Sequence, residues 1–245
     1  MNKLNVVIPM AGLGSRFVSA GFQKPKPFID VNGKPMIVRV LENLSCDDAH
    51  YILIARKEHL EAETIIVNQI LERFNASFVS IDFLTEGSAC TILHARNFID
   101  NEVPLLIANS DQIIDFDVRT FVNEAKKRNL DGSILTFIDK SKNPKWSFAK
   151  VDINDIVIEV REKQPISHYA TVGIYFFNKG KYFVDGCIDM IIKNERTNNE
   201  FYTCPVYNEL IEQGRVIGIF NIHEKLMHGT GTPEDLQNYL NVLKD

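Results

Sequence analysis

The first forty residues constrain the fold and the chemistry of this chain more than any other stretch. Residues 4–9 read Leu-Asn-Val-Val-Ile-Pro, an apolar run ended by a proline, and they predict a short buried β-strand. Gly12 and Gly14 follow, and they let the chain turn tightly and bring backbone N–H groups near an anion. Arg16 adds a charge that can donate to two phosphate oxygens. The sequence therefore predicts an anion-binding loop directly after a strand.

Lysine–proline pairs extend this region. The chain continues with Lys24-Pro25-Lys26-Pro27 and then with Gly33-Lys34-Pro35-Met36-Ile37. Because proline fixes its own φ and restricts the residue before it, these lysines are held on an extended segment. Glycines, an arginine and lysines so close together predict a site for a polyphosphate. A dinucleotide-binding turn is disfavoured, since it needs a third glycine where Phe17 stands.

The combination resembles the nucleotidyltransferase superfamily typified by bacterial sugar-1-phosphate nucleotidylyltransferases. Their signature is G-x-G-x-R, a spacer, K-P and then K-P-[ML]-[IV], and residues 11–37 contain all of it. The resemblance extends from Val6 to Leu236 and implies one domain with a Rossmann-like, doubly wound mixed α/β sheet. It also implies a nucleotide-binding half at about residues 1–139 and a β-rich acceptor-binding region at about 140–230.

Length and composition restrict the class of protein. A chain of 245 residues can form one large α/β domain. Its net charge of −5 argues against a nucleic-acid-binding protein, which usually carries a basic face. The sequence contains neither an apolar run long enough for a membrane span nor a signal-peptide pattern, so we expect a cytoplasmic protein. Four widely spaced cysteines suit reduced thiols: Cys46, Cys90, Cys187 and Cys204.

Apolar and amphipathic segments alternate over the first half of the chain, which predicts a doubly wound α/β sheet. Strands are expected at 51–55, 78–83, 104–108 and 132–138. Helices are expected at 35–45, 57–74, 88–98 and 117–129. Within the second helix, we expect one buried face made of Leu60, Val67, Leu71 and Phe74.

The pattern changes after Lys140. Residues 148–153 and 156–161 predict a hairpin around Asn154-Asp155. A long apolar strand is expected at 169–177 and a further strand at 216–221. Helices are expected at 179–193, at 204–213, and from a Thr232 cap to about Leu243.

Ligands in an open α/β sheet bind at the carboxyl ends of the parallel strands. The expected strands end in the glycine loop, in Thr85-Glu86-Gly87-Ser88, and in Ser110-Asp111. The second of these resembles the loop that reads the base in the family, although a plain strand-to-helix turn is an alternative. The predicted nucleotide-binding residues are Ala11, Gly12, Leu13, Gly14, Ser15, Glu86, Gly87, Ser88 and Ser110.

Asp111 is the predicted magnesium ligand. A carboxylate at the end of a central strand, beside a phosphate site, offers the hard oxygen that Mg²⁺ prefers, and it matches the family's aspartate at this position. The alternative is a helix cap for a segment beginning near residue 113. Asp115 and Asp117 form a D-x-D, which invites a glycosyltransferase interpretation. They lie beyond the strand end, so we expect them to cap the helix beginning near residue 117.

A candidate acceptor site follows the hairpin. Glu162-Lys163 and the strand that begins at Tyr169 resemble the family's acceptor segment, in which the glutamate binds polar groups and the lysine binds the phosphate. The proline that usually follows this pair is displaced to Pro165. A solvated charge pair is the alternative. The predicted acceptor-binding residues are Glu162, Lys163, Gly173 and Glu200.

The resemblance implies an enzyme that joins a nucleoside triphosphate to a phosphorylated small-molecule acceptor and releases pyrophosphate. A sugar 1-phosphate is the first acceptor to consider, and such enzymes often supply capsule or surface-glycan assembly. Arg16 and Lys26 are the predicted catalytic residues, with Mg²⁺ on Asp111. Relatives usually carry a second metal-binding aspartate where Gly229 stands here, so we expect Asp111 to be the one strong protein ligand. Homo-oligomerisation stays open.

Three alternatives remain from the sequence alone. A cytidylyltransferase could act on a non-sugar phosphate such as a phospho-amino-alcohol or a polyol phosphate. A D-x-D glycosyltransferase would transfer from an activated sugar. A catalytically silent nucleotide-binding subunit is the third, and the presence of Arg16, Lys26 and Asp111 together argues against it.

Overall fold

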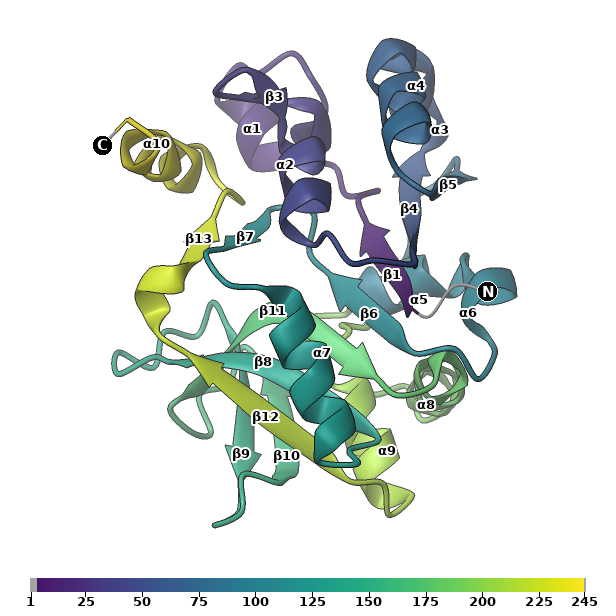
Figure 1. Cartoon of the computed structure of the whole chain (residues 1–245), viewed down its shortest axis with the longest axis vertical. Helices are drawn as coiled ribbons and strands as arrows, with labels where there is room; N and C mark the ends of the chain where they lie inside the picture. Colours follow the sequence, from purple (N-terminus) through teal and green to yellow (C-terminus); the bar gives the residue numbers. More distant parts are fainter. Residues whose placement is uncertain (1–3, 245) are drawn as a thin grey trace.

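Strand β1, Leu4–Pro9, lies within the parallel part of the sheet in the computed structural model, which describes residues 4–244 (Figure 1). It pairs in parallel with β4 on one side and with β6 on the other, and β5 pairs in parallel with β4. The parallel strands predicted from the first half are therefore confirmed. Their bounds are Ala49–Arg56 for β4, Ala76–Ile81 for β5 and Leu105–Ala108 for β6.

The sheet continues in antiparallel fashion beyond β6. Strand β11, Tyr169–Phe177, pairs antiparallel with β6, β8 and β9. Strand β12 lies parallel to β8, and β9 and β10 form the predicted hairpin. Residues 4–244 thus contain one mixed sheet of nine strands, which confirms the predicted fold class. The remaining bounds are Gly132–Ile138 for β8, Ser147–Val151 for β9, Val157–Glu162 for β10 and Ile217–Ile222 for β12.

Helices cover both faces of this sheet because its strands are apolar on both faces. Along β1, Val6 and Ile8 belong to one core and Val7 belongs to the other. The first core receives α2 (Met36–Asn43), α4 (Thr64–Arg73), α7 (Val118–Lys127) and α10 (Pro233–Val242). The second receives α5 (Ser88–Leu93), α6 (Arg96–Ile99), α8 (Gly180–Ile192) and α9 (Val206–Glu212).

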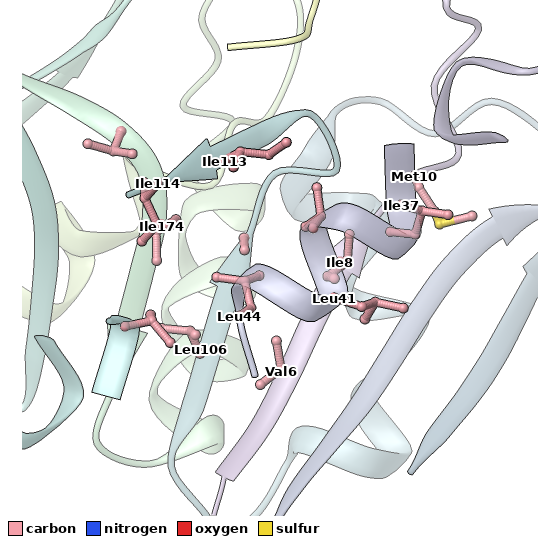
Figure 2. Close-up of a cluster of buried hydrophobic side chains, with 14 of the residues drawn as sticks. Val6, Ile8, Met10, Ile37, Leu41, Leu44, Leu106, Ile113, Ile114 and Ile174 are labelled. Atoms are coloured by element: carbon pink, nitrogen blue, oxygen red, sulfur yellow. The ribbon is translucent and has the colours of Figure 1, made fainter. Parts of the chain in front are cut away.

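Figure 2 shows how the first core anchors the lysine–proline region. Ile37 and Leu41 of α2 lie close to Val6 and Ile8 of β1. All four side chains are fully buried. The other labelled members of the cluster are Met10, Leu44, Leu106, Ile113, Ile114 and Ile174. Because α2 begins right after Pro35, this packing fixes the segment that carries the lysines.

The helix predicted at 57–74 is wrong in one respect, because it is broken in two. Helix α3, Lys57–Ala62, ends before Glu63, whose φ of −118° and ψ of 37° are not helical, and α4 begins at Thr64. Within α4, Ile66 and Ile70 are buried, whereas Leu71 is 46% exposed. Leu60, Val67 and Phe74 are partly buried and pack against the first core, as predicted, so Leu71 is the one member of the predicted face that is exposed.

The segment directly after Asp111 is a strand rather than the start of a helix. Residues Gln112–Ile114 form strand β7, which pairs with β13, Met227–Gly229, in a separate two-stranded sheet. The N-cap alternative for Asp111 is therefore wrong. Asp117 does cap α7, since its carboxylate accepts from the Arg119 N–H, but Asp115 instead binds His228 Nε2 at 2.7 Å.

Smaller elements complete the arrangement around the sheet. Thr232 caps α10 as predicted, because its hydroxyl accepts from the Asp235 N–H. The glycine loop leads into the short helix α1, Ser15–Ser19, and β2 (Asp30–Val31) pairs with β3 (Lys34–Pro35). Single 3₁₀ turns span Lys26–Phe28 and Glu224–Leu226. Within residues 4–244, none of the helices has the length and hydrophobicity that crossing a bilayer requires.

Candidate active site

A cleft of about 910 Å³ opens at the carboxyl ends of β1 and β6. Its wall is built from the glycine loop, the lysine–proline segment, the end of the β9–β10 hairpin, the loop before α9 and the turn before α10. These segments are far apart in the sequence, and the sheet brings their ends together. The position agrees with the rule that ligands bind at the carboxyl ends of parallel strands.

Most of the predicted site residues line this cleft. They are Ala11, Gly12, Arg16, Lys26, Gly87, Ser88, Ser110, Asp111, Glu162, Lys163, Gly173 and Glu200. The four that do not line it are Leu13, Gly14, Ser15 and Glu86. Leu13 is 56% exposed, Ser15 begins α1, and the carboxylate of Glu86 binds Arg196 at 2.5 Å. These side chains therefore lie outside the cleft lining, while nucleotide binding by the backbone of these four residues stays a prediction.

Gly14 serves the site by packing against the stem of Lys26. Its φ is +61°, and a Cβ added there would lie 3.1 Å from Lys26 Cβ. Only a residue without a side chain fits both the left-handed backbone and this close approach. Phe17, which stands where a dinucleotide-binding turn needs glycine, is buried and packs edge-on against Phe22. The loop therefore supports a lysine rather than a dinucleotide-binding helix.

The two lysines of the proline-rich segment have different partners. Lys26 donates from Nζ to Asp111 Oδ2, and both side chains are about one-fifth exposed, at 20% and 21%. Lys24 instead donates to Glu63 at 2.9 Å, outside the cleft lining. Arg16 lines the cleft and, within residues 4–244, forms no ion pair of its own. Lys26 is therefore ion-paired within the cleft, whereas Arg16 lines the cleft without an ion pair among the described residues.

A turn from the C-terminal part of the chain holds the backbone of Asp111 by hydrogen bonds. The N–H and the hydroxyl of Thr230 donate to the Asp111 backbone carbonyl oxygen at 2.8 and 3.0 Å. Thr230 is fully buried. A Cβ added to Gly231 would lie 2.8 Å from Asp111 Oδ2, so this turn leaves space for the carboxylate only because residue 231 has no side chain.

The donor set near Asp111 fits a weakly held magnesium ion. No cluster of three or more His, Cys, Asp or Glu side chains suited to a metal occurs in the part of the chain that the structure describes. Nothing lies within 4 Å of a Cβ added to Gly229, so the position of the family's second aspartate is open space. Asp235 lines the cleft, but its carboxylate accepts from the Thr232 hydroxyl at 2.7 Å. Asp111 thus offers one hard oxygen ligand group beside the phosphate loop.

Gly87 joins the loop after β5 to the loop before α9. Its φ is +125°, and a Cβ there would lie 2.3 Å from the Phe201 carbonyl oxygen. The Phe201 N–H donates to the Glu86 carbonyl at 2.8 Å, and the Ala89 N–H donates to the Phe201 carbonyl at 3.0 Å. The hydroxyls of Ser88 and Thr203 also bond, at 2.9 Å. The predicted base loop and the predicted acceptor loop are therefore joined into one wall of the cleft.

Glu162 and Lys163 both face the cleft because the backbone turns between them. Lys163 has a φ of +56°, and its N–H donates to the Trp146 carbonyl at 3.0 Å. Its ammonium donates to the Tyr202 hydroxyl at 2.5 Å and lies 4.5 Å from the centre of that ring. Glu162 is 8% exposed and accepts from the Ser147 hydroxyl. Burial raises the pKa of Glu162, although Ser147 and Lys163 act in the opposite direction.

Gly173 lets β11 approach the end of β6. Its φ is +89°, and a Cβ there would lie 2.3 Å from Asn109 Nδ2. The Asn109 N–H donates to the Gly173 carbonyl at 3.0 Å. The register of β11 against β8 shifts between Thr171 and Tyr175, around this glycine. The irregularity aligns the acceptor segment with the strand that leads to Asp111.

Several residues of the cleft escaped sequence reasoning. Ser147 stands opposite Glu162 in the β9–β10 pairing, so the register of the predicted hairpin could have identified it. Trp146, Tyr202 and Asn109 also line the cleft, although none of them was a predicted site residue. Asn109 is positioned by contact with β11, and Tyr202 by contact with Lys163. Both contacts join segments that are distant in the sequence, and the spacing of motifs along the chain does not predict such contacts.

Comparisons with known proteins place this geometry in a family. The model of the nucleotidyl transferase family matches residues 5–236. The chain is similar to the bifunctional protein GlmU of Methanococcus aeolicus, with 26% identity over 218 residues, 88% of this chain and 49% of that protein. It is also similar to the UTP–glucose-1-phosphate uridylyltransferase AglF of Haloferax volcanii, with 22% identity over 79% of this chain and 86% of that protein. The chain spans about half the length of the GlmU relatives.

Solved structures share the fold. A nucleoside-diphosphate-sugar pyrophosphorylase from Vibrio cholerae RC9 has a TM-score of 0.80 and 24% identity, with 96% of this chain and 99% of that chain covered. A UDP-glucose pyrophosphorylase complexed with UDP-glucose has a TM-score of 0.78 and 18% identity, with 100% and 99% covered. The Rossmann-like sheet of these proteins confirms the predicted architecture. Because the family model covers nearly every element described above, from β1 into α10, the chain belongs to the nucleotidyl transferase family.

Proposed function

We propose that this protein is a nucleotidylyltransferase that joins a nucleoside triphosphate to a phosphorylated acceptor, with a sugar 1-phosphate as the first candidate, and releases pyrophosphate. The observation that supports the proposal most is the shared cleft. It collects Arg16, Lys26 and Asp111 at one end and the Glu162-Lys163 pair at the other. One cleft can therefore hold a polyphosphate and a second phosphate ester next to each other.

The chemistry is an in-line displacement at phosphorus. An oxygen of the acceptor phosphate attacks the α-phosphorus, a new phosphoanhydride bond forms, and the bond to the β-phosphate oxygen breaks as pyrophosphate leaves. The protein contributes position and charge rather than a covalent intermediate. In this scheme Arg16 binds the leaving pyrophosphate, and Lys26 holds the α-phosphoryl oxygens.

The carboxylate of Asp111 is the group that would hold Mg²⁺ in this protein. When bound, the ion would neutralise phosphate charge and fix the geometry of the triphosphate. Lys26 now pairs with this carboxylate, so its transfer to a phosphate would free Asp111 as a ligand. The Thr230 turn holds the backbone of Asp111 in place during that exchange.

The acceptor end uses the residues after the hairpin. Lys163 would bind the acceptor phosphate, because its ammonium lines the cleft and is fixed by Tyr202. Glu162 would accept a hydrogen bond from a polar group of the acceptor. Gly87 and Gly173 keep the walls of the two substrate sites in contact with each other.

A substrate grid tests the proposal. CTP, UTP, GTP, dTTP and ATP are each combined with sugar 1-phosphates and with phospho-alcohols, and pyrophosphate release is measured with Mg²⁺ present. Release that requires both substrates is the expected result. If no pair releases pyrophosphate while a nucleotide still binds by calorimetry, the protein is a silent nucleotide-binding subunit instead.

The same grid separates the remaining alternatives. A cytidylyltransferase acting on a non-sugar phosphate would release pyrophosphate with CTP and a phospho-alcohol only. A D-x-D glycosyltransferase is disfavoured by geometry, because Asp117 caps α7 and Asp115 binds His228. Neither side chain is among the described residues that line the cleft.

A further inference from the structure

Glu162 is a buried carboxylate without a cation in contact. Its oxygen Oε2 accepts from the Ser147 hydroxyl, and within residues 4–244 no hydrogen bond or ion pair reaches Oε1. Lys163 is the next residue, but its ammonium donates to the Tyr202 hydroxyl. Oε1 is not among the fully buried atoms that lack a partner, so a ligand in the cleft can reach it. A carboxylate in a largely buried residue with no cation in contact favours the binding of a ligand that brings a positive charge to it.

A second carboxylate adds to the negative charge at this end of the cleft. Glu200 lines the same cleft and is exposed at its mouth. After burial, the charge of Glu200 is a further cause that raises the pKa of Glu162, and it also raises the pKa of Tyr202. The aromatic rings are already occupied, since Lys145 lies over Trp146 at 4.5 Å and Lys163 lies over Tyr202. The charge of Lys163 lowers the pKa of Glu162 more than that of Glu200 raises it, but within residues 4–244 no cation forms an ion pair with either carboxylate, whereas each ring has a cation over it.

We propose that the acceptor carries a protonated amine in addition to its phosphate, and that Glu162 Oε1 receives this ammonium while Glu200 adds attraction at the mouth. The inference rests on the proposed function, because it takes this end of the cleft as the acceptor site. Lys163, beside Glu162, would keep the phosphate. The acceptor class is then an amine-bearing phosphate ester, either an amino sugar 1-phosphate or a phospho-amino-alcohol. A hydroxyl in place of the amine forms a weaker, neutral hydrogen bond to the carboxylate.

Two matched pairs of ligands test the charge directly. Glucosamine 1-phosphate is compared with glucose 1-phosphate, and 2-aminoethyl phosphate with 2-hydroxyethyl phosphate. Binding of each to the full chain is measured by calorimetry, and kcat/KM is measured by pyrophosphate release with each of the five nucleoside triphosphates. We expect the amine to be favoured about tenfold in one pair, as a charge-assisted bond replaces a neutral one. The pair that shows the preference identifies the source as sugar or amino alcohol.

Variants assign the preference to the carboxylates. Glu162→Gln should reduce the amine-to-hydroxyl ratio to about one, and Glu200→Gln should reduce it in part, because its charge acts from the exposed mouth. Glu159→Gln is the matched control, since Glu159 lies on the same strand and pairs with Arg161 at 2.7 Å outside the cleft lining. If Glu162→Gln fails to fold, Glu200→Gln still carries the test.

The outcomes separate this inference from the proposed function. An amine preference that Glu162→Gln or Glu200→Gln lowers, and Glu159→Gln does not, supports the inference. Equal or stronger binding of the hydroxyl member in both pairs overturns it, as does a preference that survives in both cleft variants or an absence of binding by all four ligands. If no combination releases pyrophosphate, the proposed function has failed, and the calorimetric preference alone decides the inference.

Discussion

Lys26 donates a hydrogen bond to the carboxylate of Asp111 across 85 residues of sequence, so the predicted catalytic cation and the predicted metal ligand form one ion pair. A glycine packs against each partner. Gly14 leaves space for the stem of Lys26, and Gly231 leaves space for the carboxylate of Asp111. The ion pair therefore depends on both the glycine loop and the turn before α10. Because the two side chains bind each other, a change in one alters the charge available to the other.

Replacement of Lys26 should affect turnover more than nucleotide binding. We expect Lys26→Ala to lower kcat by about two to three orders of magnitude, as for other preorganised groups that stabilise charge in a transition state, with a smaller change in nucleotide KM. Steady-state kinetics with the active pair from the grid measure both. Lys24→Ala is the control, because Lys24 binds Glu63 outside the cleft lining. A Lys26→Ala enzyme that keeps more than half of its kcat would exclude Lys26 from the chemistry.

Magnesium should bind weakly to the protein alone. A lone carboxylate that already holds an ammonium gives a dissociation constant at about the millimolar level or weaker. Nucleotide should strengthen the binding, and Asp111→Ala should abolish most activity. Lys26→Ala should strengthen magnesium binding to the nucleotide-free protein, since it removes a competing positive charge. Calorimetry with Mg²⁺ tests each statement, and tight binding to the unmodified protein would contradict the single-carboxylate site.

Loss of Lys163 should affect the acceptor and not the nucleotide. Lys163→Ala removes the ammonium that Tyr202 positions, so we expect KM for the acceptor to rise by about tenfold or more while nucleotide affinity stays nearly unchanged. Lys150→Ala is a control on the same hairpin, because Lys150 is exposed on β9 outside the cleft lining. A fall in nucleotide affinity with an unchanged acceptor KM would show that the acceptor site is assigned to the wrong residue.

A side chain at Gly87 should separate the two walls of the cleft. A Cβ there meets the Phe201 backbone at 2.3 Å in a left-handed conformation, so Gly87→Ala should lower the free energy of unfolding by at least about 2–3 kcal/mol. Gly214→Ala is the matched control, with a φ of +77° and nothing within 4 Å, and it should cost about 1 kcal/mol. Urea unfolding measures both variants. Equal losses would mean that the contact with Phe201 is unimportant.

Glu162 should make the protein less stable as the pH rises. Burial raises its pKa above the ordinary value of 4.5, so the folded chain keeps a proton that the unfolded chain releases. Its contribution is therefore present below that ordinary value and is lost as the pH rises through the raised one. Urea unfolding across this range should show a shallower decline for Glu162→Gln. An unchanged slope would indicate that Glu162 ionises at its ordinary value.

The sequence predicted the elements better than the contacts between them. Strand β11 has the predicted bounds, Tyr169–Phe177, because its long apolar run is buried on both faces. The spacing of the glycine and lysine–proline motifs predicted that Lys26 belongs to the site, and the position of Asp111 at the end of a strand predicted the same for Asp111. Both residues line the cleft. Neither method could show that the two residues pair, since that contact depends on how α2 and the turn before α10 pack. The break at Glu63 has no marker in the local sequence, since neither glycine nor proline occurs between Lys57 and Phe74.

The contact between Thr230 and Asp111 can form only late in the synthesis of the chain. A ribosome releases β1, β4 and β6 early, and these strands can pair as they emerge. The backbone of Asp111 acquires its clamp only when Thr230, 119 residues later, has left the exit tunnel. Strand β12 likewise reaches β8 late. Nascent chains stalled before residue 230 therefore contain most of the segments that line the cleft but lack the hydrogen bonds that hold the backbone of Asp111.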